Sequence, residues 1–261
     1  MMMQTHPNTE GWVSFERSAT IGILTFFHPA HNSLPGKLLS GLAEQIALAG
    51  ADPLVKVILL QSAGEKTFCA GASFDELMAI ADPDQGLEFF MGFARVINAL
   101  RQCPKLVIGR IQGKAVGGGV GLAAATDFCV ATQAASIKLS ELAVGIGPFV
   151  VGPAVERKMG KAATLQLAIQ AEAWQSAQWA QQHGLFQEVF EDTPSMDAWL
   201  EGYLARLSDY SAAAMQALKA AFWEGTEHWD ELLAQRAAIS GRLILTPEAK
   251  NALAAIKQKN R

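Results

Sequence analysis

Two apolar runs, each leading into a loop of small residues, constrain the fold of this chain more than any other feature. Residues 55–61 and 106–111 are almost continuously apolar, which is typical of buried strands. The loops after them, at residues 69–73 and 113–119, are rich in small residues, and a helical pattern follows each loop. Strand, loop and helix alternate in this way through about residue 140, which predicts an α/β fold.

The remaining elements follow from hydrophobic periodicity. Apolar residues at helical spacing predict helices at residues 36–49, 74–81, 84–101 and 118–125. Runs rich in β-branched and aromatic residues predict strands at residues 12–16, 21–27, 127–132, 136–140 and 186–190, the first two as a hairpin. Beyond residue 152 the pattern is otherwise helical. We therefore expect a core of residues 1–195 and a C-terminal helical region of residues 196–261, whose aromatic residues could also meet another subunit.

Composition excludes several classes of function. The net charge of −4 gives none of the basic surface that nucleic-acid-binding proteins carry. No apolar run reaches the roughly 18–20 residues that cross a bilayer, and the first residues lack the pattern of a secretory signal. The cysteines Cys69, Cys103 and Cys129 are dispersed among apolar neighbours, and no pair has metal-ligand spacing. We expect a cytoplasmic protein with buried, reduced cysteines, no metal and no membrane or nucleic-acid partner.

The glycines at 117–119 suggest a specific chemistry. A helix that starts here presents N–H groups that have no partner inside the helix. If the small-residue loop at 69–72 supplies a second N–H group, the two can converge on one carbonyl oxygen as an oxyanion hole, in which one good donor contributes about 3–4 kcal/mol. Glu141 would then move a proton beside that oxygen. The glycines are also explained if both loops are only tight turns. Without further evidence, Glu141 is equally typical of an acidic residue at the surface. The complete glycine fingerprint of a dinucleotide site is absent.

Three motifs together resemble the crotonase superfamily, also called the enoyl-CoA hydratase/isomerase family. They are FCAGA at 68–72, GKAVGGGVGLAAATD at 113–127 and LSELAVG at 139–145, and the HPAHN segment at 28–32 resembles the family's early loop. The resemblance covers most of the chain. It implies a spiral of ββα units, a C-terminal helical region that trimerises, and acyl-CoA thioesters as substrates, with no other cofactor.

The same resemblance assigns roles to individual residues. The N–H groups of Ala72 and Gly118 correspond to the donors that stabilise the thioester enolate, and backbone at Ala70 and Ala72 corresponds to the adenine contacts. Glu141 corresponds to a catalytic acid/base. Pro148 and Phe149 fall in the turn that borders the acyl group, where Phe149 replaces a common glycine and should narrow the pocket. Lysines also qualify as contacts for the phosphates of CoA, namely Lys37, Lys66, Lys250, Lys257 and Lys259.

One departure from the family pattern bears on the reaction. Typical hydratases of the family carry a second glutamate where this chain has Gly121, so a two-carboxylate hydration is in doubt. The resemblance leaves several readings open: an enoyl-CoA hydratase or isomerase that uses one glutamate, a hydratase of branched acyl groups such as methylglutaconyl-CoA, a dehalogenase, decarboxylase or hydrolase variant, and an acyl-CoA-binding protein without activity. It also implies a homotrimer or a dimer of trimers. If position 121 is arranged as in hydratases, Gly121→Glu should raise the hydration of crotonyl-CoA.

Overall fold

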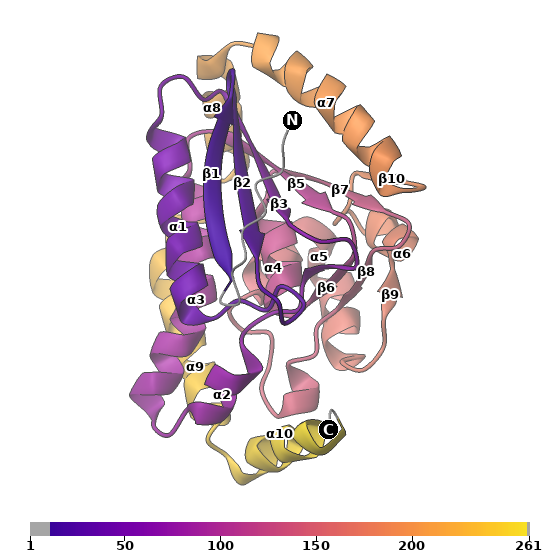
Figure 1. Cartoon of the computed structure of the whole chain (residues 1–261). Helices are drawn as coiled ribbons and strands as arrows, with labels where there is room; N and C mark the ends of the chain where they lie inside the picture. The colour runs from indigo at the N-terminus through magenta and orange to yellow at the C-terminus, as the bar shows by residue number, and fades with distance from the viewer. Residues whose placement is uncertain (1–10, 260–261) are drawn as a thin grey trace.

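The computed structural model describes residues 11–259 and shows an α/β fold built on two sheets (Figure 1). The larger sheet has the strand order β1–β2–β3–β5–β7–β10. Its first pair is the expected antiparallel hairpin, and its other pairs are parallel. The strands are β1 (Trp12–Ser18), β2 (Ile21–Phe27), β3 (Val57–Ser62), β5 (Leu106–Ile111), β7 (Phe128–Thr132) and β10 (Glu188–Phe190).

The smaller sheet consists of short strands in the order β4–β6–β8–β9. They are β4 (Thr67–Cys69), β6 (Lys114–Val116), β8 (Ser136–Lys138) and β9 (Gln175–Ser176). The first three are parallel to one another, and β9 is antiparallel to β8. Strand β9 was not expected from the sequence. Strand β8 is shorter than the expected 136–140, because the chain turns after Lys138 into a short 3-10 helix, η1 (Leu142–Val144).

The helices agree closely with the sequence pattern, and those expected at 36–49, 74–81, 84–101 and 118–125 differ from the observed ones by two residues or fewer at either end. The helices are α1 (Gly36–Ala51), α2 (Phe74–Ala79), α3 (Pro83–Gln102), α4 (Gly118–Ala125), α5 (Gly152–Ile169), α6 (Ala177–Gln182), α7 (Thr193–Asp209), α8 (Ala212–Phe222), α9 (Trp229–Leu243) and α10 (Pro247–Lys259).

The chain passes from the large sheet to the small sheet and then into a helix three times in succession. These passages are β3–β4–α2, β5–β6–α4 and β7–β8 followed by η1 and α5. They form the expected spiral of ββα units. Because β4, β6 and β8 are adjacent and parallel, their carboxyl ends lie at one edge of the small sheet. In open parallel sheets this edge is where ligands bind.

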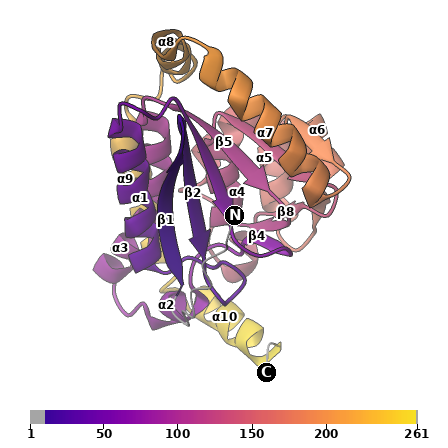
Figure 2. The same ribbon diagram turned by 45° about the horizontal axis from the view of Figure 1, so that its top comes forward.

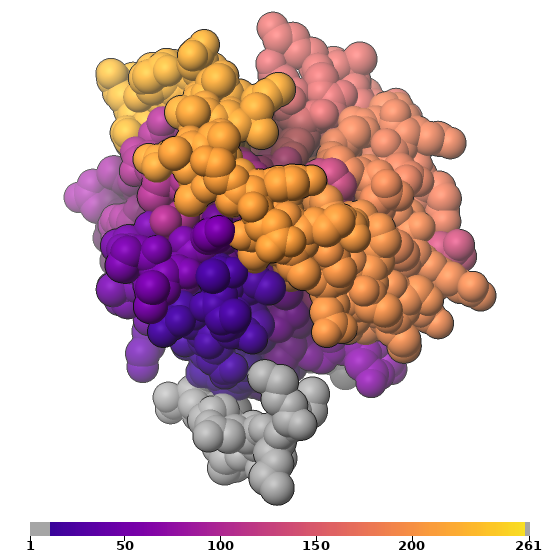
Figure 3. Space-filling model, turned by 90° about the horizontal axis from the view of Figure 1, so that it is seen from above, coloured from indigo at the N-terminus to yellow at the C-terminus, as the bar shows by residue number. Residues whose placement is uncertain are grey.

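Apolar side chains cover both faces of the large sheet. On one face, Leu24, Phe26, Ile58 and Leu60 belong to the main core, together with residues of α1, α3 and α4. On the other face, α7 places Met196, Leu200 and Leu204 against Val57, Ile108 and Val130. Figure 2 shows α7 lying across the strands, and Figure 3 shows the same orange segment over part of the face seen from above. The central strands β3, β5 and β7 are therefore buried between two helical layers, as their apolar sequences predict.

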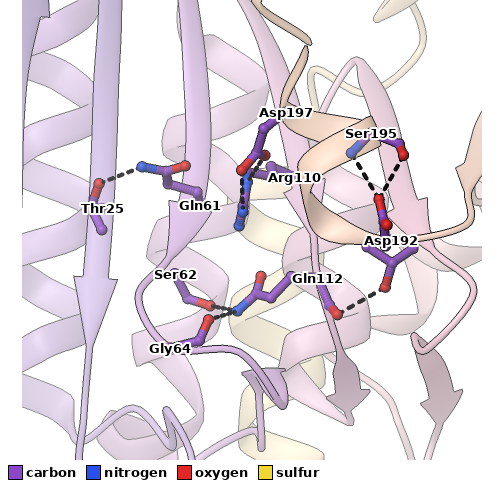
Figure 4. Close-up of polar contacts among 10 residues, drawn as sticks. Thr25, Gln61, Ser62, Gly64, Arg110, Gln112, Asp192, Ser195 and Asp197 are labelled. Atoms are coloured by element: carbon purple, nitrogen blue, oxygen red, sulfur yellow. Dashed lines mark hydrogen bonds and ion pairs between the residues drawn. The ribbon is translucent and has the colours of Figure 1, made fainter. Parts of the chain in front are cut away.

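Polar contacts fix α7 and the loop between the two sheets. Arg110 of β5 donates two hydrogen bonds to the carboxylate of Asp197 on α7, with distances of 2.6 and 2.9 Å (Figure 4). The buried Gln112 donates through Nε2 to Ser62 Oγ at 2.9 Å and to the carbonyl of Gly64 at 3.0 Å. Gln112 thus holds the turn from β3 into β4, which leads to the loop at residues 69–73.

The C-terminal helices are only partly buried. Met215, Trp223, Trp229 and Leu233 are buried as expected, but Leu218 and Phe222 of α8 are 52% and 70% exposed. Residue 196 lies within α7, and the division into 1–195 and 196–261 stays a prediction. All three cysteines are free and buried. Within residues 11–259, no helix combines the length and apolar character that crossing a membrane requires. The expectation about a secretory signal concerns residues that lie outside the described range.

Candidate active site

Loops from the ends of three neighbouring strands surround one cavity of about 620 Å³. Ala70, Gly71 and Ala72 follow β4, Gly117 and Gly118 follow β6, and Ser140 and Glu141 follow β8. The N–H group of Gly117 donates to the carbonyl of Lys138 at 2.8 Å and so joins the second loop to the third. The spiral of ββα units therefore brings together segments that lie up to 71 residues apart in the sequence, from Ala70 to Glu141.

Glycines allow the first two loops to approach each other closely. Gly71 has a φ of +89°, and a Cβ atom there would lie 3.0 Å from the carbonyl oxygen of Val116 and 3.6 Å from the nitrogen of Gly118. A Cβ on Gly119 would overlap the carbonyl oxygen of Cys69. Neither loop could carry larger side chains at these positions, because the backbones themselves are in contact.

The N–H groups of Ala72 and Gly118 are available to a ligand. Helix α4 begins at Gly118, and its first internal bonds run from the N–H groups of Val120 and Gly121 to the carbonyl of Gly117, at 2.9 and 3.2 Å. Among the described residues, the structure shows no acceptor for the N–H group of Gly118 or of Ala72. Both residues line the cavity, and their role as donors to a substrate stays a prediction. Two free N–H groups on converging loops are the arrangement that stabilises a developing oxyanion.

Glu141 lies next to this pair of loops. A Cβ on Gly117 would be 2.9 Å from Glu141 Oε1, so the missing side chain of Gly117 makes room for the carboxyl group. Glu141 keeps some accessible surface, but its Oε2 is buried and has no hydrogen-bond partner among the described residues. Burial raises the pKa of Glu141 to about 7, and a hydrogen bond from its own backbone N–H opposes part of that rise. The carboxyl group can therefore exchange a proton near neutral pH.

Apolar side chains form most of the remaining wall. Phe89, Phe90 and Phe93 come from α3, and Ile256 comes from α10. Pro148 and Phe149 also line the cavity, and the Phe149 ring packs against Gly147, where a Cβ would lie 2.7 Å from it. Such a wall makes the surroundings of Glu141 less polar, which is consistent with the raised pKa of its carboxyl group.

Gly121 does not line the cavity, contrary to the expectation that it contacts the substrate. It is buried in α4, and a Cβ on it would lie 2.5 Å from Val151 Cγ1 and 2.7 Å from Val151 Cβ. Val151 itself lines the cavity. The position from which a side chain at residue 121 would enter the site is therefore occupied by Val151. Because the two residues are 30 positions apart, the local sequence pattern does not reveal this contact.

Four polar residues that line the cavity were not among the expected substrate contacts, namely Lys138, Ser140, Glu172 and Ser240. Lys138 and Ser140 were within reach of sequence reasoning, because side chains two apart on a strand share a face and both precede Glu141. Glu172 belongs to the connection between α5 and β9, which carries no recognisable motif. The lysines at positions 37, 66, 250 and 257 do not line the cavity, and the side chain of Lys259 lies outside the described part of the chain.

Comparisons with known proteins agree with this arrangement. The model of the enoyl-CoA hydratase/isomerase family matches residues 16–256. The mitochondrial 3-hydroxyisobutyryl-CoA hydrolase of Bos taurus is 30% identical over 167 residues, which cover 61% of this chain but only 43% of that protein, so this chain corresponds to less than half of that relative's length. The ethylmalonyl-CoA decarboxylase of Gallus gallus is 29% identical over 215 residues, which cover 79% of this chain and 70% of that protein.

The crystal structure of an enoyl-CoA hydratase from Bacillus halodurans aligns with 93% of this chain and 99% of its own, with a TM-score of 0.86 and 23% identity. At that identity the likeness concerns the fold. The family match is broader than either sequence relative, since it runs from β1 into α10. On this evidence the chain belongs to the enoyl-CoA hydratase/isomerase family, within the crotonase superfamily.

Proposed function

We propose that the protein catalyses proton transfer at the carbon chain of an unsaturated acyl-CoA thioester. The N–H groups of Ala72 and Gly118 would bind the thioester oxygen and stabilise it as an enolate, each contributing about 3–4 kcal/mol in the transition state. Glu141 would remove or deliver the proton at the adjoining carbon. Backbone at Ala70 and Ala72 would contact the adenine of CoA, so that the substrate enters from the first loop.

The observation that carries this proposal is the state of Glu141. Its Oε2 is buried without a partner beside an apolar cavity, and burial raises the pKa of its carboxyl group to about 7. A group with a pKa near the working pH both accepts and returns a proton efficiently. The neighbouring free N–H groups supply the stabilisation of negative charge that the proton transfer requires.

A shift of the double bond is the reaction that this site favours. Isomerisation needs one group that carries a proton between two carbons, and Glu141 can do this alone. Val151 occupies the space beside Gly121, so no carboxylate reaches the cavity from that helix. Single-acid hydration of a compact or branched acyl group is the second candidate, because the hydroxyl of Ser140 lines the cavity and can hold a water molecule.

Activity on a panel of thioesters tests the proposal. Purified protein and its Glu141→Gln variant are incubated with crotonyl-CoA, a 3-enoyl-CoA and methylglutaconyl-CoA, and the products are identified by mass spectrometry. We expect turnover of at least one thioester and a loss of about 100- to 10,000-fold in Glu141→Gln, with CoA binding retained. Activity in Glu141→Gln within about twofold of the parent removes Glu141 from the mechanism. Binding of CoA without any turnover identifies a non-catalytic protein, and release of free CoA identifies a hydrolase.

We also propose that the protein assembles as a homotrimer. The exposed Leu218 and Phe222 of α8 support an interface, since large apolar side chains at the surface are often covered by another subunit. Sedimentation equilibrium measures the assembly mass directly, and a monomer at micromolar concentration contradicts the proposal.

A further inference from the structure

Two lysines share one tryptophan at the margin of the cavity. The ammonium groups of Lys114 and Lys138 lie 5.0 and 4.6 Å from the centre of the Trp174 ring. The ring is 42% exposed, so a solute can reach it and both lysines. We call these three residues the lysine–tryptophan cluster.

The strand register places this cluster on the same face as the cavity. Val116 pairs with Lys138 across β6 and β8, and Lys114 shares the face of Val116 because it is two residues away on the same strand. Ile137 pairs with Gln175, so Trp174 falls opposite Lys138 on that face. Val116 and Lys138 both line the cavity. Lys114 and Trp174 are not among the residues that line the cavity, so the cluster adjoins the cavity through Lys138.

The two positive charges have no counter-charge among the described residues. No ion pair or hydrogen bond involves either ammonium group, although contacts with the Trp174 ring hold both of them. Glu172 lines the same cavity but forms no ion pair with either lysine. Two ammonium groups held near one ring repel each other, and an anion placed between them would reduce that repulsion. The cluster thus has the charge and the access of an anion-binding site.

We propose that the lysine–tryptophan cluster binds a carboxylate at the far end of the acyl group, so that the preferred substrates are thioesters of dicarboxylic acids. This inference rests on one part of the proposed function, namely that the thioester carbonyl binds at the N–H group of Gly118. Since Gly117 donates a hydrogen bond to the carbonyl of Lys138, the backbone of Lys138 is beside that position. A carboxylate a few bonds from the thioester is then within reach of the lysine side chain. The phosphates of CoA are the alternative anion, and titration of free CoA distinguishes them from an acyl carboxylate.

Calorimetry with two saturated thioesters tests the assignment without any need for turnover. Glutaryl-CoA carries a terminal carboxylate, and 5-methylhexanoyl-CoA carries an isopropyl group of the same shape without charge. Both are titrated into the wild-type protein and into the variants Lys138→Met and Lys114→Met. Lys161→Met is the matched control, because the Lys161 side chain is 88% exposed and does not line the cavity.

We expect the wild-type protein to bind glutaryl-CoA about 5- to 10-fold more tightly than 5-methylhexanoyl-CoA, with a preference that shrinks in added salt. Lys138→Met should abolish the preference and leave the affinity for 5-methylhexanoyl-CoA within about twofold, while Lys161→Met should change neither. Equal affinity for the two ligands in the wild-type protein overturns the proposal, and so does a preference that survives in Lys138→Met. Equal weakening of both ligands and of free CoA in Lys138→Met shows that the anion is a CoA phosphate and overturns the assignment to the acyl group. If the protein prefers glutaryl-CoA in these titrations but turns over no thioester, the proposed function is contradicted and the assignment of the cluster still holds.

Discussion

The contact between Gly121 and Val151 predicts that Gly121→Ala destabilises the wild-type protein but stabilises a variant in which Val151 is replaced by glycine. A Cβ on Gly121 would lie 2.5 Å from Val151 Cγ1, 2.7 Å from Val151 Cβ and 3.5 Å from Val151 Cα. Gly121→Ala in the wild-type protein therefore overpacks the interface of α4 and α5, at a cost of about 1–3 kcal/mol. Removing a glycine from a helix interior returns about 0.5–1 kcal/mol. The net result is a less stable protein.

In a Val151→Gly background the same substitution should be stabilising. The nearest atom of residue 151 is then its Cα at 3.5 Å, an ordinary van der Waals distance. The overpacking cost disappears and the helical gain of about 0.5–1 kcal/mol remains. The coupling free energy between the two substitutions should therefore be about 1–3 kcal/mol. Val151→Gly itself should cost about 2–3 kcal/mol, because Val151 is only 4% exposed.

Urea unfolding of the four proteins at one protein concentration measures this coupling. The fluorescence of the buried Trp223 and Trp229 reports unfolding. A free-energy change for Gly121→Ala that is the same in both backgrounds would refute the reasoning, since it would mean that the two residues do not share a volume. This contact also corrects the expectation that Gly121→Glu alone raises the hydration of crotonyl-CoA: the longer side chain has no room while Val151 is present. The paired variant Gly121→Glu, Val151→Gly is the one that should raise hydration.

Further outcomes follow from the site and its support. Burial raises the pKa of Glu141 to about 7, above its unfolded value of about 4.3, so the native state binds more protons and the wild-type free energy of unfolding falls as the pH rises from about 4.5 to about 7. Measured against Glu141→Gln, the wild-type protein should lose on the order of 3 kcal/mol of unfolding free energy over this range. If the difference in urea midpoint between the two proteins is the same at about pH 5 and about pH 8, the prediction is contradicted. Gly117→Ala should lower kcat/KM by about 10- to 100-fold, because residue 117 has a φ of +52° and its Cβ would meet Glu141 Oε1 at 2.9 Å; unchanged kinetics would show that neither contact matters. Lys219→Met should cost about 3–5 kcal/mol, because its buried ammonium group lies 2.9 Å from Asp127 Oδ2 and donates to the carbonyls of Leu100 and Lys105; a loss below about 1 kcal/mol in urea unfolding speaks against that role.

Local sequence pattern was enough to place most of the helices and strands around the cavity. The helix at 118–125 has the expected ends, because its glycines mark the turn and its apolar residues mark a buried segment. Ala72, Gly118, Glu141 and Phe149 line one cavity, while their roles toward a substrate stay predictions. Their adjacency depends on the parallel order of β4, β6 and β8, which the family resemblance supplied and the local pattern alone did not.

The features that sequence reasoning missed depend on contacts between distant segments. Val151 fills the space beside Gly121, and Trp174 meets Lys114 and Lys138 only because β9 adds to the small sheet. Strand β9 has two residues, too few for a periodic signal. Because these residues lie far apart in the sequence, local pattern predicts neither the contact of Gly121 with Val151 nor the lysine–tryptophan cluster.

Exchange of the α-hydrogen of a saturated acyl-CoA in D₂O tests the central claim most directly. The claim is that Glu141 moves a proton at the carbon beside a thioester whose oxygen binds the N–H groups of Ala72 and Gly118. Mass spectrometry of butanoyl-CoA should show deuterium uptake with the wild-type protein and uptake at least about 100-fold slower with Glu141→Gln, at equal occupancy of the site. Equal rates of uptake in the two proteins would contradict the account.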